Sequence, residues 1–300
     1  MHLRPRYLLS LAALVLCLEG RAQMGNLSGG GSFIEEYTNF LTVDAPWRLS
    51  GDVLIVGEGS EIRAMLPYGG SVDGGKAFAE IVNRCAELFP EVRVYCMPIP
   101  TACEFYTPYL AESTIRSQAA VISSLFSFLS PAVQPVDVYS TLGRHAAEPV
   151  FARTDHRWLP LGAYYAAEAF AETADVPFRE LDGYQEKEVS GFSGTLSRYT
   201  KDQALLDAPE RFTRYLRKDN EGLHPSGRRL LIIKDGSGKM LTEFLQFSFE
   251  EIRLADCRRF RGEMGRIIRT GGITDIVFAI DLEHIGMPAV LSSLRSYLDR

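Results

Sequence analysis

The chain alternates short, nearly continuous apolar runs with longer segments in which apolar residues recur every three or four positions. The first pattern predicts buried strands and the second predicts helices. The expected strands are 52–57, 92–97, 135–139, 229–234, 251–256 and 274–280. The expected helices are 76–89, 117–129, 161–174, 239–247, 264–269 and 288–298. The order predicts an α/β fold.

The last quarter of the chain shows the pattern most clearly. Three successive strand–helix units follow Gly227, and their strands are rich in Ile, Leu and Val. Such strands are buried on both faces, which predicts a mainly parallel sheet between two layers of helices, a three-layer α/β/α sandwich. Segment 176–227 is rich in charge and glycine, and we expect it to be an irregular insertion over the sheet edge.

The N-terminus has the pattern of an export signal. Arg4 and Arg6 precede an apolar run over 7–18, and small residues at 20–22 favour cleavage before Gln23. The run is too short to cross a bilayer, which takes about 20 apolar residues. The alternative is an uncleaved anchor. We therefore expect a signal peptide over 1–22, a flexible segment over 23–46, one domain over 47–300, and a periplasmic or secreted protein.

Charge and cysteine content narrow the class of protein. The net charge of −6 becomes −8 after cleavage, because the leader carries three arginines and one glutamate. This acidity argues against nucleic-acid binding. No second apolar run predicts a transmembrane segment after leader cleavage. Among the four remaining cysteines, Cys96 and Cys103 are the one pair considered for a disulfide, and Cys85 and Cys257 are expected to pack as small apolar residues. No metal-ligand spacing or cofactor motif is recognised.

Two short motifs carry candidate chemistry. Segment 154–158 precedes a predicted helix, and segment 234–238 forms a turn after a predicted buried strand. Ligands of open parallel sheets bind beyond the carboxyl ends of the strands. An acid, an imidazole and a hydroxyl brought together there, Asp155, His156 and Ser237, could perform acyl transfer: the acid orients the imidazole, which activates the hydroxyl.

The same region resembles a known family. Residues 151–158 (FARTDHRW) and 160–165 (PLGAYY) are similar to the signature of the DHHW proteins, bacterial exported relatives of the SGNH (GDSL-type) hydrolases and of the alginate O-acetyltransferases. Further segments fit in order, at 98–106, 191–196 and 272–277. The resemblance covers most of the chain from about 53 to 280 and implies an SGNH-hydrolase-like fold.

The resemblance also assigns roles to positions. The family's acid falls on Asp155, its imidazole on Arg157, and its serine nucleophile on Gly236 within the turn Asp235-Gly236-Ser237-Gly238. Arginine does not accept a proton at usable pH, and glycine has no hydroxyl. Two of the three catalytic groups are therefore substituted, and the inherited mechanism cannot run as written.

Neighbouring residues leave alternatives open. His156 and Ser237 each lie one position from the expected group and could rebuild the site together. Alternatively, His156 is a polar loop residue and Ser237 caps a helix. Asp155 could pair with Arg157, cap a backbone, or be a remnant of catalysis.

Other polar signals are weaker. Gly236-Ser237-Gly238-Lys239 lacks the spacing of a phosphate-binding loop. His145, His224 and His284 lie on separate segments and are expected at the surface. The basic cluster at 258–261 is expected to be a solvated helix start, with contact to an anionic glycan as the alternative.

Three hypotheses for function follow. The first is a catalytically degenerate exported protein that binds an acylated or anionic envelope glycan or supports an active protein partner. The second is an active carbohydrate esterase or O-acetyltransferase that uses Ser237, His156 and Asp155. The third is a structural or assembly protein of the cell envelope.

Overall fold

The computed structural model describes residues 45–108, 111, 116–218, 226–259 and 264–298. A five-stranded sheet in the order β5-β4-β10-β8-β9 forms its centre, and each pair of neighbouring strands is parallel. Its strands are β4 (Arg93–Ile99), β5 (Val133–Pro135), β8 (Arg229–Lys234), β9 (Glu251–Asp256) and β10 (Asp275–Asp281). The expected parallel sheet is confirmed.

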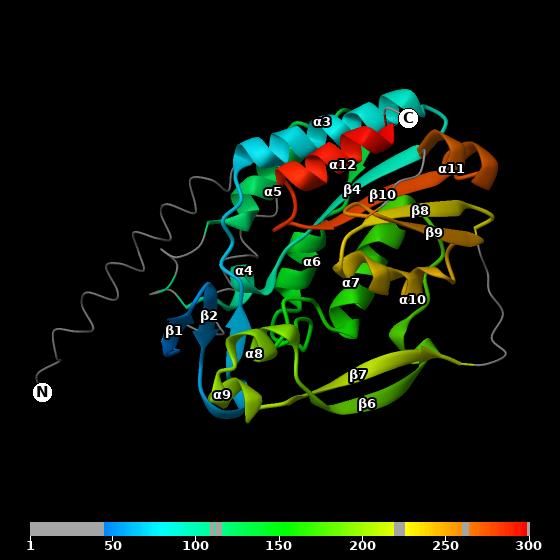
Figure 1. Ribbon diagram of the computed structural model, residues 1–300. Helices are drawn as coiled ribbons and strands as arrows, with labels where there is room; N and C mark the ends of the chain where they lie inside the picture. Colours follow the sequence, from blue (N-terminus) through cyan, green and yellow to red (C-terminus); the bar gives the residue numbers. More distant parts are fainter. Residues whose placement is uncertain (1–44, 109–110, 112–115, 219–225, 260–263, 299–300) are drawn as a thin grey trace, which may run out of the picture.

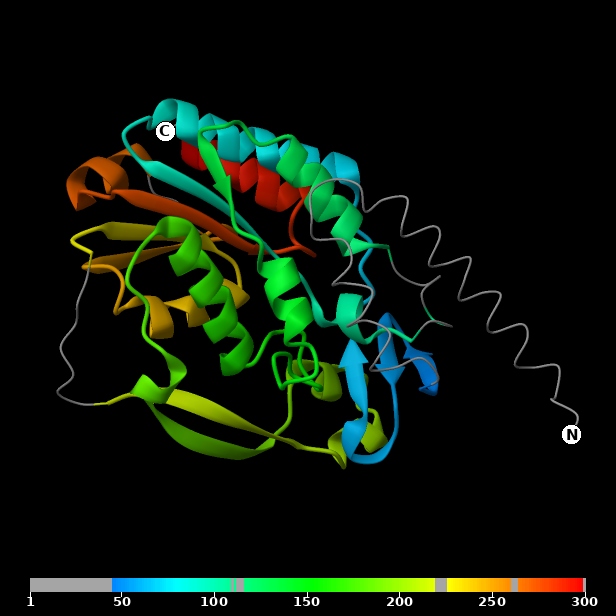
Figure 2. The same cartoon turned by 180° about the vertical axis from the view of Figure 1, so that it is seen from behind.

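Helices cover both faces of this sheet, which confirms the three-layer α/β/α architecture (Figures 1 and 2). One layer contains α3 (Val72–Leu88), α5 (Gln118–Ser127), α11 (Met264–Gly271) and α12 (Pro288–Leu298). The other contains α6 (Val138–Arg144), α7 (Pro160–Ala174) and α10 (Thr242–Leu245). Helix α3 shows why these segments are helical: Phe78, Ile81, Val82 and Cys85 lie on its buried side, and the Ser71 hydroxyl caps its first turn.

Two expected strands differ from the structure. Residues 53–56 form a strand, β2 (Val53–Val56), but it pairs antiparallel with β1 (Trp47–Ser50) and β3 (Arg63–Met65), outside the main sheet. Between β2 and β3 the positive φ of Gly57 and Gly59 lets the chain reverse. The strand expected at 135–139 is wrong in position: β5 ends at Pro135, and Val138 and Tyr139 already lie in α6, because Asp137 accepts a hydrogen bond from the Ser140 amide and caps that helix.

The segment expected to be an irregular insertion contains regular structure. β6 (Tyr184–Phe192) and β7 (Glu210–Arg217) pair antiparallel, with an irregular register between Val189 and Phe192. Helices α8 (Thr195–Thr200) and α9 (Gln203–Leu206) connect them. The pair packs on α7 and α10 through Tyr184, Tyr215 and Phe244 (Figure 1). Both strands are mostly exposed, so no apolar run marks them in the sequence.

Short helical turns complete the described elements. These are η1 (Gly59–Glu61), α4 (Ala102–Tyr106), η3 (Leu181–Gly183) and η4 (Ser237–Leu241). A main core fills both sides of the parallel sheet, and a smaller apolar cluster joins β2 and β3 to α8 and α9. Across the described ranges no helix has the length and apolar character needed to cross a bilayer.

The described cysteines are all reduced. Cys96 and Cys103, considered for a disulfide, are free buried thiols, as are Cys85 and Cys257. The signal peptide at 1–22, and the flexible segment apart from residues 45 and 46, lie outside the described residues.

Candidate functional site

The sheet brings the two sequence motifs to one edge. The turn at 235–238 follows β8, and the loop at 152–157 connects α6 to α7. A bridge between Phe151 and Trp158 closes this loop at its base. A Cβ atom added to Gly236 would lie 4.0 Å from Arg157 Cδ, and no closer atom is present outside the adjoining residues. The positions that the family resemblance assigns to nucleophile and imidazole are therefore direct neighbours, but a glycine and an arginine occupy them.

Asp155 is buried and accepts five hydrogen bonds. Arg157 donates from its amide (3.2 Å), Nε (2.8 Å) and Nη2 (3.1 Å), and Thr195 donates from its amide (2.9 Å) and hydroxyl (3.0 Å). Burial raises the pKa of this carboxyl, but the hydrogen bonds from Arg157 and Thr195 outweigh it and hold the pKa well below its usual range. Asp155 is thus an anion at neutral pH and forms a bidentate ion pair with Arg157.

Arg157 has the position of a base but not the chemistry of one. Its hydrogen bond to Asp155 raises its pKa further, so it stays protonated. Nη1 donates to no described group, and the side chain is 42% exposed. The guanidinium is held on one side by Asp155 and presents the other side to solvent.

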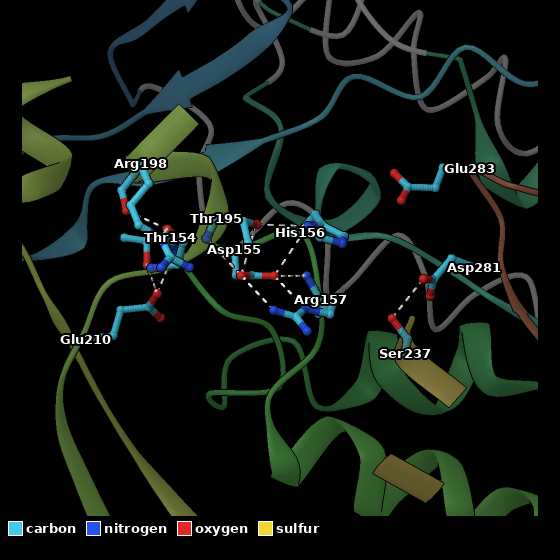
Figure 3. A network of polar contacts seen from close by, with 12 residues as sticks. Thr154, Asp155, His156, Arg157, Thr195, Arg198, Glu210, Ser237, Asp281 and Glu283 are labelled. Carbon is cyan, nitrogen blue, oxygen red and sulfur yellow. Dashed lines mark hydrogen bonds and ion pairs between the residues drawn. The ribbon is translucent and has the colours of Figure 1, made fainter. Parts of the chain in front are cut away.

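His156 and Ser237 point to different partners (Figure 3). His156 Nδ1 lies 3.1 Å from the Thr195 hydroxyl and 3.3 Å from Asp155 Oδ1. The Ser237 hydroxyl is buried and donates to Asp281 Oδ2 at 2.8 Å, and it does not cap its helix. Within the described residues, Asp155 and His156 are together, and Ser237 makes no hydrogen bond with either.

Sequence reasoning missed the groups around Ser237. Asp281 ends β10, and its amide donates to Asp235 Oδ2 at 2.8 Å. His284 Nδ1 lies 2.7 Å from the same oxygen, so this histidine is partly buried in the site rather than free at the surface. Its hydrogen bond to Asp235 raises the pKa of His284, while burial and the nearby Asp235 raise that of Asp281. The available signal was the position of Asp281 directly after a buried strand.

The insertion holds the 152–157 loop in place. Buried Glu210, at the start of β7, accepts from the Arg153 amide (2.6 Å), the Thr154 amide (2.7 Å) and the Thr154 hydroxyl (2.5 Å). Gly194 packs so closely that an added Cβ would lie 2.2 Å from the Thr154 carbonyl oxygen. The contacts between insertion and loop thus fix the backbone that presents Asp155.

A small pocket adjoins this loop. Asp155, His156 and Glu283 form its polar side, and the remaining lining comes from β3 and the start of α4: Ala64, Met65, Leu66, Thr101, Ala102 and Cys103. It is a shallow hollow whose empty space, about 210 Å³, includes open solvent. A donor set able to hold a metal lies beyond Gly236: one donor atom each from Asp235, Asp281 and His284, all within 4.8 Å of one another.

The parallel sheet and its helical layers define an SGNH-like α/β protein. The chain belongs to the DHHW family, whose model, described as DHHW protein, matches residues 50–224. This confirms the family recognised from its motifs. No curated protein matches the chain.

A solved structure of a DHHW family protein agrees with this assignment, and other solved structures are similar at lower identity. A DHHW family protein from Eubacterium siraeum is 28% identical, with 85% of this chain and 98% of that chain covered and a TM-score of 0.76. PatB1 of Bacillus cereus is 13% identical, with 82% and 99% covered and a TM-score of 0.60, a likeness of fold. The O-acetyltransferase domain of Pseudomonas putida AlgJ is 16% identical, with 84% and 99% covered and a TM-score of 0.48.

Proposed function

We propose that this protein is an exported cell-envelope member of the DHHW family that has lost the serine–histidine relay. In this proposal it binds an acylated or anionic glycan at the retained site, alone or beside an active protein partner. The observation that carries the proposal is the contact between positions 157 and 236. Acyl transfer by the inherited route needs a proton acceptor and a hydroxyl there, and the chain supplies a guanidinium and a hydrogen atom.

The binding part of the proposal rests on Arg157. Its fork is fixed by Asp155, so little side-chain entropy remains to be lost when a ligand binds. Nη1 donates to no described group, the side chain is 42% exposed, and its Cδ borders the open space at Gly236. An exposed guanidinium of this kind pairs well with a carboxylate, and it also donates to the carbonyl of an acyl group. Export rests on the leader-like pattern at 1–22.

Glycan binding is tested with the purified mature protein and a set of oligosaccharides that are uronate-containing, O-acetylated or neutral. We expect a uronate or acetylated member to bind in calorimetry, and Arg157→Ala to weaken binding about tenfold or more, the loss of one charge-assisted hydrogen bond. Arg229→Ala is the matched control, because Arg229 is similarly exposed (39%) and ion-paired but lies at the opposite end of β8. Equal affinity of the Arg157 variant and the control would contradict the proposal.

An active esterase or O-acetyltransferase is the second proposal, favoured by one observation. The imidazole of His156 contacts Asp155, and Ser237 lies at the same edge of the sheet. That reaction requires Ser237 to leave Asp281 and reach His156. A fluorophosphonate probe, with the adduct mapped by peptide mass spectrometry, separates the two proposals. We expect no adduct on the wild-type protein; labelling at Ser237 that Ser237→Ala removes would establish the active alternative.

A further inference from the structure

A second polar cluster adjoins the Asp155–Arg157 pair, across Gly236 from it. Lys234 of β8 pairs with Ala279 of β10; Asp235 directly follows β8, and Asp281 is the last residue of β10, so both lie at the carboxyl ends of two adjacent strands. Both carboxyl groups are buried, and His284 joins them from the loop after β10. Each of the three residues offers one donor atom, and these three atoms lie within 4.8 Å of one another.

This cluster is short of positive charge. Among the described residues, His284 is the one basic side chain that pairs with Asp235, and none pairs with Asp281. Nearby cationic groups make their ion pairs with other carboxylates: Arg157 with Asp155, and both Lys234 and Arg258 with Asp256. Arg157 acts on Asp281, and Arg258 on Asp235, only through longer-range electrostatic interactions. Two buried carboxylates that share one imidazole are costly unless protons or a cation compensate them.

The donor chemistry suits a transition metal ion. Two carboxylate oxygens and one imidazole nitrogen are ligands that Zn²⁺ and Mn²⁺ accept, and three protein ligands leave a fourth position for water. The Ser237 hydroxyl hydrogen-bonds Asp281 Oδ2 at 2.8 Å and can orient that ligand. Bonds of about 2.0–2.2 Å place ligand atoms about 3.3–3.6 Å apart in a tetrahedron. The three donor atoms here lie within 4.8 Å of one another, so they would have to approach one another to reach that separation.

Surrounding groups already orient the three ligands. The amides of Ser237 and Asp281 donate to the two oxygens of Asp235. His284 Nε2 faces Glu283 Oε1 at 3.9 Å. Protein metal sites use such outer contacts to fix the rotamer of each ligand.

We propose that Asp235, Asp281 and His284 form a binding site for a divalent transition metal ion, with Zn²⁺ as the best-fitting ion. The metal takes the place of the proton on His284 and joins the carboxyl ends of β8 and β10. The inference does not depend on glycan binding or on catalysis by the protein.

The test is calorimetric titration of the untagged protein, stripped with a chelator, with Zn²⁺ and separately with Mn²⁺ and Mg²⁺. We expect about one Zn²⁺ per chain, bound more tightly than Mg²⁺, and a rise in the unfolding temperature on Zn²⁺ addition. If neither Zn²⁺ nor Mn²⁺ binds at about 1 mM metal, any dissociation constant is weaker than about 1 mM, a binding free energy of only about 4 kcal/mol. That result would overturn the proposal.

Two variants locate the ion. His284→Gln keeps a hydrogen-bond donor toward Asp235 but removes the imidazole, and Asp281→Asn keeps an acceptor for Ser237 but removes the charge. Each should weaken Zn²⁺ binding more than about tenfold, since even outer contacts of metal sites are worth that much. Far-UV circular dichroism of the metal-free variants checks folding, and either folded variant suffices for the test.

The matched control is His145→Gln. His145 Nδ1 also faces a carboxylate, Glu148 Oε1 at 2.6 Å, but among the described residues no further His, Cys, Asp or Glu joins that pair in a three-donor group. Zn²⁺ affinity should be unchanged in this control. Binding that survives in both His284→Gln and Asp281→Asn, or that is lost in His145→Gln, would place the ion elsewhere and overturn the proposal.

Discussion

Restoring the two substituted groups should create a reactive serine. The perturbation is the double variant Arg157→His, Gly236→Ser. Gly236 has φ −69° and ψ −51°, a right-handed conformation that serine adopts without strain. The added Cβ would meet Arg157 Cδ at 4.0 Å, an ordinary contact, so the side chain fits. Asp155 is in place to accept the imidazole N–H, as it now accepts from Arg157 Nε.

The expected magnitude follows from the role of the base. A serine Oγ lies about 1.4 Å from its Cβ and can therefore come within the 2.6–3.2 Å of an imidazole nitrogen that proton transfer requires. General-base assistance contributes about 10²–10⁴-fold in rate. We expect the double variant to react with a fluorophosphonate about 10²–10⁴ times faster than Gly236→Ser alone.

The assay measures the rate of adduct formation at residue 236 by peptide mass spectrometry, in a Ser237→Ala background that removes the neighbouring hydroxyl. Adding Asp155→Asn to the double variant should reduce the rate again, because the imidazole loses its orienting acid. A folded double variant that reacts no faster than Gly236→Ser would refute the reasoning that positions 157 and 236 retain the inherited geometry.

Three further predictions concern the support of the site. Glu210→Ala leaves two amides and a hydroxyl without their acceptor, and should lower the free energy of unfolding in urea by about 3 kcal/mol. The control Glu188→Ala, at an exposed position on the paired strand, should change it by less than about 0.5 kcal/mol. Equal effects of the two substitutions would contradict the anchoring role of Glu210. Gly194→Ala forces a backbone shift and should lower the free energy of unfolding by about 1–3 kcal/mol in the same assay. An unchanged urea midpoint would contradict the close packing of Gly194 on Thr154. The pKa of Asp155 is depressed on folding, so its stabilisation is present above its unfolded pKa of about 4 and is lost as pH falls toward the folded pKa. Thermal unfolding of Arg157→Ala should therefore depend less on pH below about 4 than that of the wild type, and parallel curves would refute this assignment.

The parallel sheet was predictable because its strands must be apolar on both faces. β8, β9 and β10 lie within about one residue of their expected limits for this reason. The strands of the insertion escaped prediction because solvent covers most of their surface, and the short β5 because a capping aspartate starts the next helix. Local signals therefore identify buried elements well and exposed ones poorly.

The site was predictable only in part. The pairing of Asp155 with Arg157 is a contact two residues apart in sequence, and it was among the expected alternatives. The contacts of Ser237 with Asp281, and of Asp235 with His284, depend on β10 lying beside β8. Apolar runs indicate that strands are parallel but not their order in the sheet, so sequence alone could not bring these residues together.

The hydrogen bonds of Asp155 explain why an acid at this position does not by itself indicate catalysis. In the inherited arrangement the carboxylate orients an imidazole. Here it accepts from the fork of Arg157 and from the amide and hydroxyl of Thr195, and so ties the 152–157 loop to the start of α8. A buried carboxylate with five donors would be costly to remove from the fold. Its presence therefore has a sufficient structural reason, and activity must be judged from what occupies positions 157 and 236.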